Sequence, residues 1–69
     1  MKAYEVIRNQ QLNRGIPVSE LSRRTEIEYQ ALRNSLDGAR NITANEFVVL
    51  CRELGLSLSD FEQVGTTPN

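Results

Sequence analysis

Four polar residues of types that recognise nucleic-acid bases stand close together in the middle of the chain: Tyr29, Gln30, Arg33 and Asn34. An amide side chain offers a hydrogen-bond donor beside an acceptor, as adenine requires, and a guanidinium group can reach guanine or a phosphate. Their spacing predicts one polar edge of a helix over residues 28–36. A helix with such an edge fits the major groove of DNA, so these residues are candidates for reading base edges.

The elements that must position this edge are two short amphipathic helices joined by a tight corner, predicted over residues 16–38. Pro17 can start the first helix because its missing N–H costs nothing there, and this helix is expected to reach about Arg24. We expect the corner at residues 25–27 and the end of the second helix at 37–38. Thr25 and Glu28 also have the spacing of a capping box. The predicted buried side consists of Leu21, Ile27, Leu32 and Leu36.

Three further helices are predicted outside this segment. The first covers residues 2–14 and ends at Gly15, a residue suited to the left-handed conformation that closes many helices. Thr43 and Glu46 form a capping box that opens a helix over residues 44–54. Ser57 can cap a last short helix. The fold class predicted is therefore all-α, a compact bundle of five short helices with a helix-turn-helix, over residues 1–64, followed by a flexible tail at 65–69.

Apolar residues of the last two helices predict part of the core. Phe47, Leu50, Cys51 and Leu54 recur at helical spacing, so we expect Cys51 to be an inert core residue. Leu58, Phe61 and Val64 are also expected to be mainly core, with a surplus of apolar surface that could form a twofold interface.

Composition excludes several classes of protein. With 69 residues, no histidine and one cysteine, the chain has no disulfide framework and no donor set for a zinc site. An enzyme is also disfavoured, because the chain offers neither a phosphate-binding loop nor a plausible pair of nucleophile and base. We expect no cofactor. No apolar run approaches the ~18 residues of a membrane span and no signal-peptide pattern opens the chain, which together predict a cytoplasmic setting.

Charge is unevenly distributed, although the net charge is only −1 and the pI about 5.3. Residues 1–40 carry seven basic and five acidic side chains, net +2, whereas residues 41–69 carry one basic and four acidic side chains, net −3. Any basic face is therefore expected in the first part of the chain. The alternative is that these arginines form an ordinary solvated surface.

The order and spacing of several short motifs resemble the lambda-repressor-like, Cro-type helix-turn-helix family of phage and bacterial regulators. The resemblance covers roughly residues 3–64. The motifs that carry it are Gly15-Ile16 before the second helix, Leu21-Ser22 within it, the Asp37-Gly38 turn, and Leu54-Gly55-Leu56-Ser57. It implies a transcription regulator of the repressor type, acting on double-stranded DNA in the cytoplasm of a bacterial host.

The resemblance also implies roles for particular residues. The base-reading positions of the family fall on Tyr29, Gln30, Arg33 and Asn34. The implied phosphate contacts are Arg14, Arg40, Asn41 and Asn45. Related repressors dimerise through their C-terminal part, which here corresponds to Leu58, Phe61 and Val64. Such a dimer would place two recognition helices about 34 Å apart on a palindromic operator.

The chain departs from the family at three places. Glu26 stands where the family has a corner glycine, so a non-glycine residue is expected to adopt the left-handed conformation. Pro17 and Val18 replace a polar cap and a DNA-contacting glutamine. Gln11 and Leu36 together replace an Arg–Glu pair, so no unpaired buried charge is left behind.

Two functional hypotheses remain open at this point. The first is a sequence-specific DNA-binding regulator. The second is a helix-turn-helix module for protein–protein contact, which the acidic pI and the changes at Pro17 and Val18 favour. Glu26 and Glu28 bear on the choice, because carboxylates near a helix start stabilise the helix but oppose an approaching phosphate backbone.

Overall fold

The computed structural model of the chain describes residues 1–65. This part consists of four α-helices and one short 3-10 helix, and residues 1–65 contain no strand. The helices are α1 (Ala3–Asn13), α2 (Val18–Thr25), α3 (Tyr29–Leu36), α4 (Ala44–Leu54) and η1 (Leu58–Phe61). The all-α prediction is confirmed. The expected fifth helix is a single 3-10 turn, and residues 66–69 of the predicted tail lie outside the described residues.

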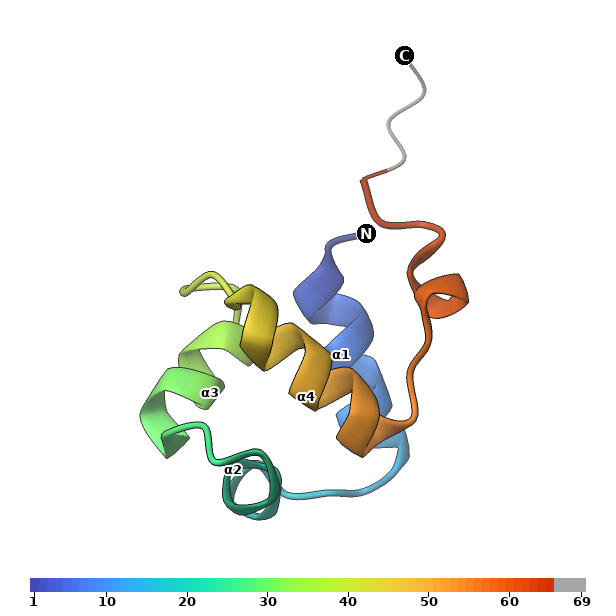
Figure 1. Cartoon of the computed structure of the whole chain (residues 1–69). Coiled ribbons are helices and arrows are strands. Elements are labelled where there is room, and N and C mark those ends of the chain that lie inside the picture. Colours follow the sequence, from blue (N-terminus) through green and yellow to red (C-terminus); the bar gives the residue numbers. More distant parts are fainter. Residues whose placement is uncertain (66–69) are drawn as a thin grey trace.

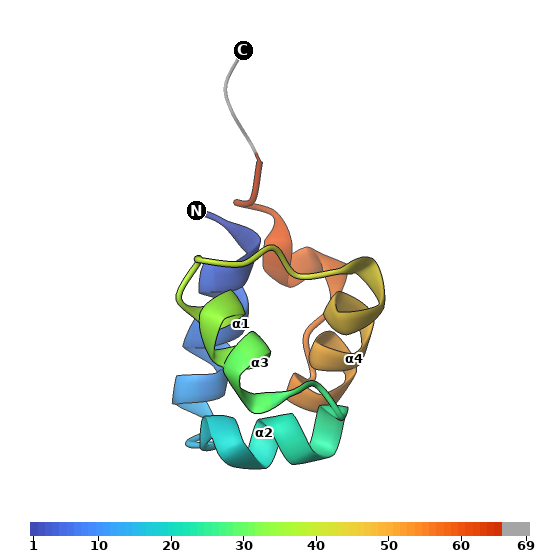
Figure 2. The same ribbon diagram turned by 90° about the vertical axis from the view of Figure 1, so that its left-hand side faces the viewer.

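The helices pack around one small core. Helices α1 and α4 contact each other, α2 contacts α3 and α4, and α3 also contacts α1. Figure 1 shows α4 crossing in front of α1, and Figure 2 shows α2 lying across one end of the molecule, below both. None of the described helices is long and apolar enough to cross a membrane.

The core consists of apolar side chains contributed by all four α-helices and the α2–α3 corner. The four residues predicted as the buried side of residues 16–38 are all buried. Within residues 1–65 the buried apolar residues are Ile7, Leu21, Ile27, Leu32, Leu36, Leu50 and Leu54. Of the four residues of α4 that were predicted as core, Leu50 and Leu54 are buried. Phe47 and Cys51 are partly exposed at the edge of the core.

Cys51 is therefore a boundary residue rather than a core residue. Burial raises the pKa of the Cys51 thiol, and the nearby Asp60 carboxylate raises it further. Both effects disfavour the thiolate, which is the reactive form of cysteine. The side chain is thus less buried than predicted, while its environment keeps the thiol protonated.

Local hydrogen bonds define where α4 begins. The Thr43 hydroxyl accepts from the backbone N–H of Glu46 at 3.2 Å, and the Glu46 carboxylate accepts from the backbone N–H of Thr43 at 3.0 Å. This reciprocal arrangement satisfies two N–H groups that have no partner within the helix. The predicted capping box at residues 43–46 is confirmed.

The second predicted capping box, at Thr25 and Glu28, is wrong. The Thr25 hydroxyl is buried and donates to the carbonyl oxygen of Leu21 within α2, at 2.8 Å. Glu28 is itself the N-cap of α3, where its carboxylate accepts from the backbone N–H groups of Gln30 and Ala31 at 2.9 and 3.0 Å. Thr25 cannot cap α3 because it is still the last residue of α2.

Gln11 and Leu36 are both buried without a charge. Leu36 lies in the core, and Gln11 is buried with its side-chain amide donating to the carbonyl oxygen of Ile16. The backbone N–H of Ile16 in turn donates to the carbonyl oxygen of Gln11 at 3.1 Å. These hydrogen bonds of Gln11 stabilise the connection between α1 and α2, and neither Gln11 nor Leu36 places a charge in the core.

Candidate nucleic-acid interface

The corner between α2 and α3 is only three residues long, and each of them is restrained. Glu26 has φ 59° and ψ 25°, the left-handed conformation expected at this position. Ile27 is buried in the core, and its carbonyl oxygen accepts from the Ser22 hydroxyl. Glu28 caps the next helix. These restraints set the direction in which α3 leaves the corner.

The four predicted base-reading residues all lie on α3, and none of them belongs to its buried side. Leu32, Ser35 and Leu36 form the buried side of the helix. Tyr29 is 43% exposed, Gln30 and Arg33 are also exposed, and Asn34 is partly buried. We call Tyr29, Gln30, Arg33 and Asn34 the α3 edge.

Polar contacts within α3 organise this edge. The side-chain amide of Gln30 donates to Asn34 Oδ1 at 3.1 Å, one helical turn further on. Arg33 Nε lies 3.9 Å from a carboxylate oxygen of Asp37, and both side chains are more than half exposed. An exposed pair at this distance contributes little to stability, so Arg33 is free to exchange Asp37 for another anion.

Two carboxylates flank the start of the α3 edge. Hydrogen bonds from the backbone N–H groups, first of Gln30 and then of Ala31, hold the pKa of Glu28 below its usual value. Glu28 is therefore charged at neutral pH and is committed to capping α3. Within residues 1–65 the Glu26 side chain has neither a hydrogen bond nor an ion pair, so its charge faces solvent.

The four predicted phosphate-contacting residues are not brought together into one group. Arg40 and Asn45 line a cleft of about 350 Å³ beside the start of α3, together with Glu26, Glu28 and Ala31. Asn41 lines a different cleft with Arg40. Arg14 lines neither cleft and lies against Gly55 at the end of α4, where an added Cβ would be 2.7 Å from its guanidinium group.

Arg40 already has anionic and polar partners within the protein. Its guanidinium group donates to both carboxylate oxygens of Glu46, at 2.9 and 3.0 Å, and to the Ser35 hydroxyl at 2.8 Å. Two other predicted phosphate contacts, Asn41 and Asn45, are exposed, and neither side chain has a hydrogen-bond partner within the described part of the chain.

Several other arginines of the basic half are also engaged. Glu20 forms ion pairs with both Arg23 and Arg24, the latter at 2.9 Å. These hydrogen bonds, chiefly the one from Arg23, lower the pKa of Glu20. Arg8 lies over the ring of Tyr4, 5.6 Å from its centre. The charge count along the sequence did not reveal these pairs. The spacing of Glu20 to Arg23 and Arg24, by three and four residues, was the available signal.

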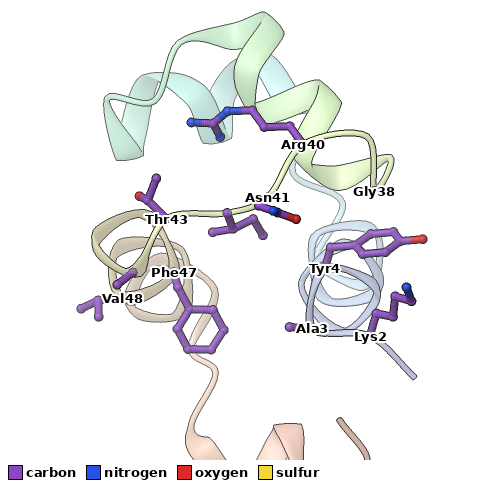
Figure 3. Close-up of a pocket in the computed structure, with 11 residues that line it drawn as sticks. Lys2, Ala3, Tyr4, Gly38, Arg40, Asn41, Thr43, Phe47 and Val48 are labelled. Carbon is purple, nitrogen blue, oxygen red and sulfur yellow. The ribbon is translucent and has the colours of Figure 1, made fainter. Parts of the chain in front are cut away.

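A larger cleft of about 710 Å³, which the sequence did not suggest, separates the start of α1 from the start of α4. Figure 3 shows Tyr4 of α1 beside Gly38 on one side, and Phe47 and Val48 of α4 on the other. Phe47 also packs against Phe61 of η1, with ring centres 4.9 Å apart at 57°. This cleft is mixed in character, since Lys2, Arg40 and Asn41 contribute polar groups.

The C-terminal apolar residues differ in burial. Leu58 is 83% exposed, so its assignment to the core is wrong, whereas Phe61 and Val64 are partly buried. Leu58 is the first residue of a single 3-10 turn, which is too short to cover the side chain of Leu58 as well as that of Phe61.

Comparison of the chain with known proteins adds no relationship to these observations. No protein-family model matches it, and no curated protein sequence or solved structure is significantly similar to it.

Proposed function

We propose that the chain is a sequence-specific DNA-binding regulator in which α2 and α3 form a helix-turn-helix. The observation that carries the proposal is the α3 edge: four residues suited to DNA recognition on one helix, none of them on its buried side. In this role α3 enters the major groove and Tyr29, Gln30, Arg33 and Asn34 face the base edges. The resemblance to lambda-repressor-like regulators of phages and bacteria supports the same role.

The restrained corner supports the proposal because base reading needs a helix held in one orientation. Left-handed Glu26, buried Ile27 and the Glu28 cap each limit the motion of α3 relative to α2. Side chains on such a helix meet their partners with little further ordering, so less of the binding free energy is lost on docking.

Contacts to the DNA backbone must come from residues around α3. Asn41 and Asn45 are exposed, and the ion pair between Arg33 and Asp37 is long and solvated. Arg40 can bind a phosphate only by giving up Glu46 or by sharing its guanidinium group between both anions. We therefore propose few phosphate contacts for each protomer, and a homodimer that doubles them on a palindromic operator, with Leu58, Phe61 and Val64 in the contact between protomers.

Selection from a random DNA library tests this function directly. At low salt the chain is expected to enrich a palindromic sequence, and the affinity should fall as salt rises, because each neutralised phosphate contributes about 0.9 to the slope of log K against log salt. A variant with Gln30→Ala and Asn34→Ala should retain the fold and lose the enrichment. Failure of the wild-type chain to enrich any sequence would rule the function out.

The second candidate is a protein–protein interaction module, and internal charge pairing favours it. Arg23, Arg24 and Arg40 all bind carboxylates of the same chain, while Glu26 and Glu28 lie at the start of the α3 edge. These features weaken any attraction to DNA. The same selection separates the candidates, since an interaction module enriches no DNA sequence even at low salt.

A further inference from the structure

The Arg40 guanidinium group uses three of its five N–H groups inside the protein. Nη1 donates to the Ser35 hydroxyl at 2.8 Å and to Glu46 Oε1 at 2.9 Å, and Nη2 donates to Glu46 Oε2 at 3.0 Å. The N–H group of Nε and the second N–H group of Nη2 remain. Neither of these two donors has an acceptor within residues 1–65.

The two remaining N–H groups form one intact edge of the guanidinium plane. Nη2 is the terminal nitrogen next to the N–H group of Nε, so the two donors lie side by side and point in the same direction. We call them the Nε–Nη2 edge of Arg40. The two carboxylate oxygens of Glu46 occupy the other such edge, formed by Nη1 and Nη2. A pair of parallel N–H groups matches two oxygens of a phosphate in the same way.

The position of Arg40 leaves it accessible, although two other residues bind it. Its side chain is 34% exposed. It lines the cleft of about 350 Å³ beside the start of α3, where the exposed Asn45 side chain has no hydrogen-bond partner within the described part of the chain. Arg40 therefore has both an unused pair of donors and solvent access for a second anion.

The two partners of Arg40 are themselves fixed. Ser35 belongs to the buried side of α3. Glu46 lies in the first turn of α4, and its Oε1 also accepts from the Thr43 backbone N–H at 3.0 Å. The guanidinium group is thus held from two helices at once. A long side chain that is ordered before binding loses less conformational freedom when a complex forms.

We propose that Glu46 and Ser35 are positioning residues, which hold the Nε–Nη2 edge of Arg40 ready for a DNA phosphate; this rests on the proposed function. In the complex Arg40 then binds Glu46, Ser35 and the phosphate at the same time. The alternative is an exchange, in which Arg40 leaves Glu46 to reach the DNA and Glu46 acts as a competitor. The two mechanisms predict opposite effects of removing the Glu46 charge, because a positioning residue strengthens DNA binding and a competitor weakens it.

The experiment measures the affinity for the selected operator of the wild type, Glu46→Gln, Ser35→Ala, Arg40→Ala, and the double variant with Arg40→Ala and Glu46→Gln. Glu46→Gln and Ser35→Ala should each weaken binding about two- to tenfold, which corresponds to ordering one long side chain on docking. Ser35→Ala changes no charge, so its effect cannot come from general electrostatics. Glu46→Gln should have no effect once Arg40 is replaced, whereas a purely structural role of Glu46 would persist there.

Glu26→Gln is the matched control for the loss of a negative charge. Glu26 lines the same cleft as Arg40 and Glu46, but its side chain forms no hydrogen bond or ion pair with Arg40. Removing this carboxylate should strengthen binding, because only its repulsion of the phosphate backbone is lost. Thermal unfolding of each variant gives a temperature at which all of them are folded, and the affinities are compared at that temperature.

The possible outcomes separate this inference from the function on which it rests. If the wild type enriches no DNA sequence, the proposed function fails and the inference fails with it. If the wild type binds its operator but Glu46→Gln strengthens binding as Glu26→Gln does, Arg40 exchanges its partner and the inference alone is overturned. The same holds if Ser35→Ala or Arg40→Ala leaves the affinity unchanged, or if the effect of Glu46→Gln persists without Arg40.

Discussion

The Arg40 guanidinium forms two hydrogen bonds with the Glu46 carboxylate, Nη1 to Oε1 at 2.9 Å and Nη2 to Oε2 at 3.0 Å. Arg40 lies in the loop after α3 and Glu46 in the first turn of α4. Since Arg40 also donates to the Ser35 hydroxyl, which is buried near the end of α3, this pair connects α3 to α4. The residue predicted to hold DNA phosphate is thus also a link within the fold.

Arg40→Ala should destabilise the protein because Glu46 loses its partner and the buried Ser35 hydroxyl loses a donor. We expect a modest cost, because the pair is bidentate but still partly solvated. The midpoint of thermal unfolding should therefore fall measurably below that of the wild type. Arg52→Ala is the matched control, because the exposed Arg52 of α4 has no polar partner within residues 1–65. Equal midpoints for the two variants would contradict the prediction.

The same substitution has a separate expected effect on DNA binding under the proposed function. If Arg40 contacts a phosphate, Arg40→Ala should weaken binding to all sequences alike and lower the salt slope by about 1. Arg40→Lys should recover part of the affinity, because it keeps the charge but cannot form the bidentate pair. Titrations on the selected operator and on unrelated DNA at several salt concentrations measure both effects. A change in sequence preference would show that Arg40 is not a phosphate contact.

Stability should depend on pH through Glu46. Its pKa lies below the usual value, chiefly because Arg40 donates to it and next because the Thr43 backbone N–H does. A carboxyl group whose pKa is lower in the folded state stabilises the fold above its unfolded pKa of about 4.3. That contribution is lost as the pH falls from this value through the lower folded pKa.

Glu46→Gln provides the comparison for this pH effect, since glutamine can keep the capping box but carries no charge. At pH 6–7 the variant should unfold at a lower temperature than the wild type. The difference should shrink below about pH 4.3, where the carboxylate becomes protonated in the unfolded chain and, at still lower pH, in the fold. Unfolding curves at a series of pH values measure it, and a constant difference down to pH 2.5 would argue against the effect.

Glu26→Gly should stabilise the protein. Glu26 is the only non-glycine residue with positive φ within residues 1–65, and this conformation costs a residue with a Cβ about 1–2 kcal/mol. Glycine removes that cost but gains freedom in the unfolded chain, so the net gain should be about 0.5–1 kcal/mol. Glu26→Asn should give a smaller gain, because asparagine tolerates the left-handed conformation. Chemical denaturation measures both, and a less stable glycine variant would disprove the strain argument.

Gly38→Ala should have the opposite effect. Gly38 has φ +81°, and an added Cβ would lie 2.6 Å from Cζ of the Tyr4 ring. The left-handed strain and the displacement of Tyr4 should together cost about 1–3 kcal/mol. Gly65→Ala is a useful control, because Gly65 has a similar φ of +67° but no atom within 4 Å of an added Cβ. Equal losses in the two variants would mean that the contact with Tyr4 is unimportant.

Most of the fold was predictable from the sequence because its signals are local or periodic. The Thr43–Glu46 capping box lies within four residues, and the buried positions Leu21, Ile27, Leu32 and Leu36 follow from helical spacing. The grouping of Tyr29, Gln30, Arg33 and Asn34 was predictable for the same reason, since all four belong to one helix. Their assigned role in DNA recognition remains a prediction.

Features that depend on how separate elements meet were decided only by the tertiary structure. The pairing of Arg40 with Glu46 and Ser35 requires a loop and two helices at particular angles, which side-chain periodicity does not specify. The exposure of Leu58 depends likewise on how far a single 3-10 turn can reach over the core. Periodicity along a helix determines which side is buried. The partner of a charged side chain on a different element is determined by distances between elements, and those exist only once the helices have packed.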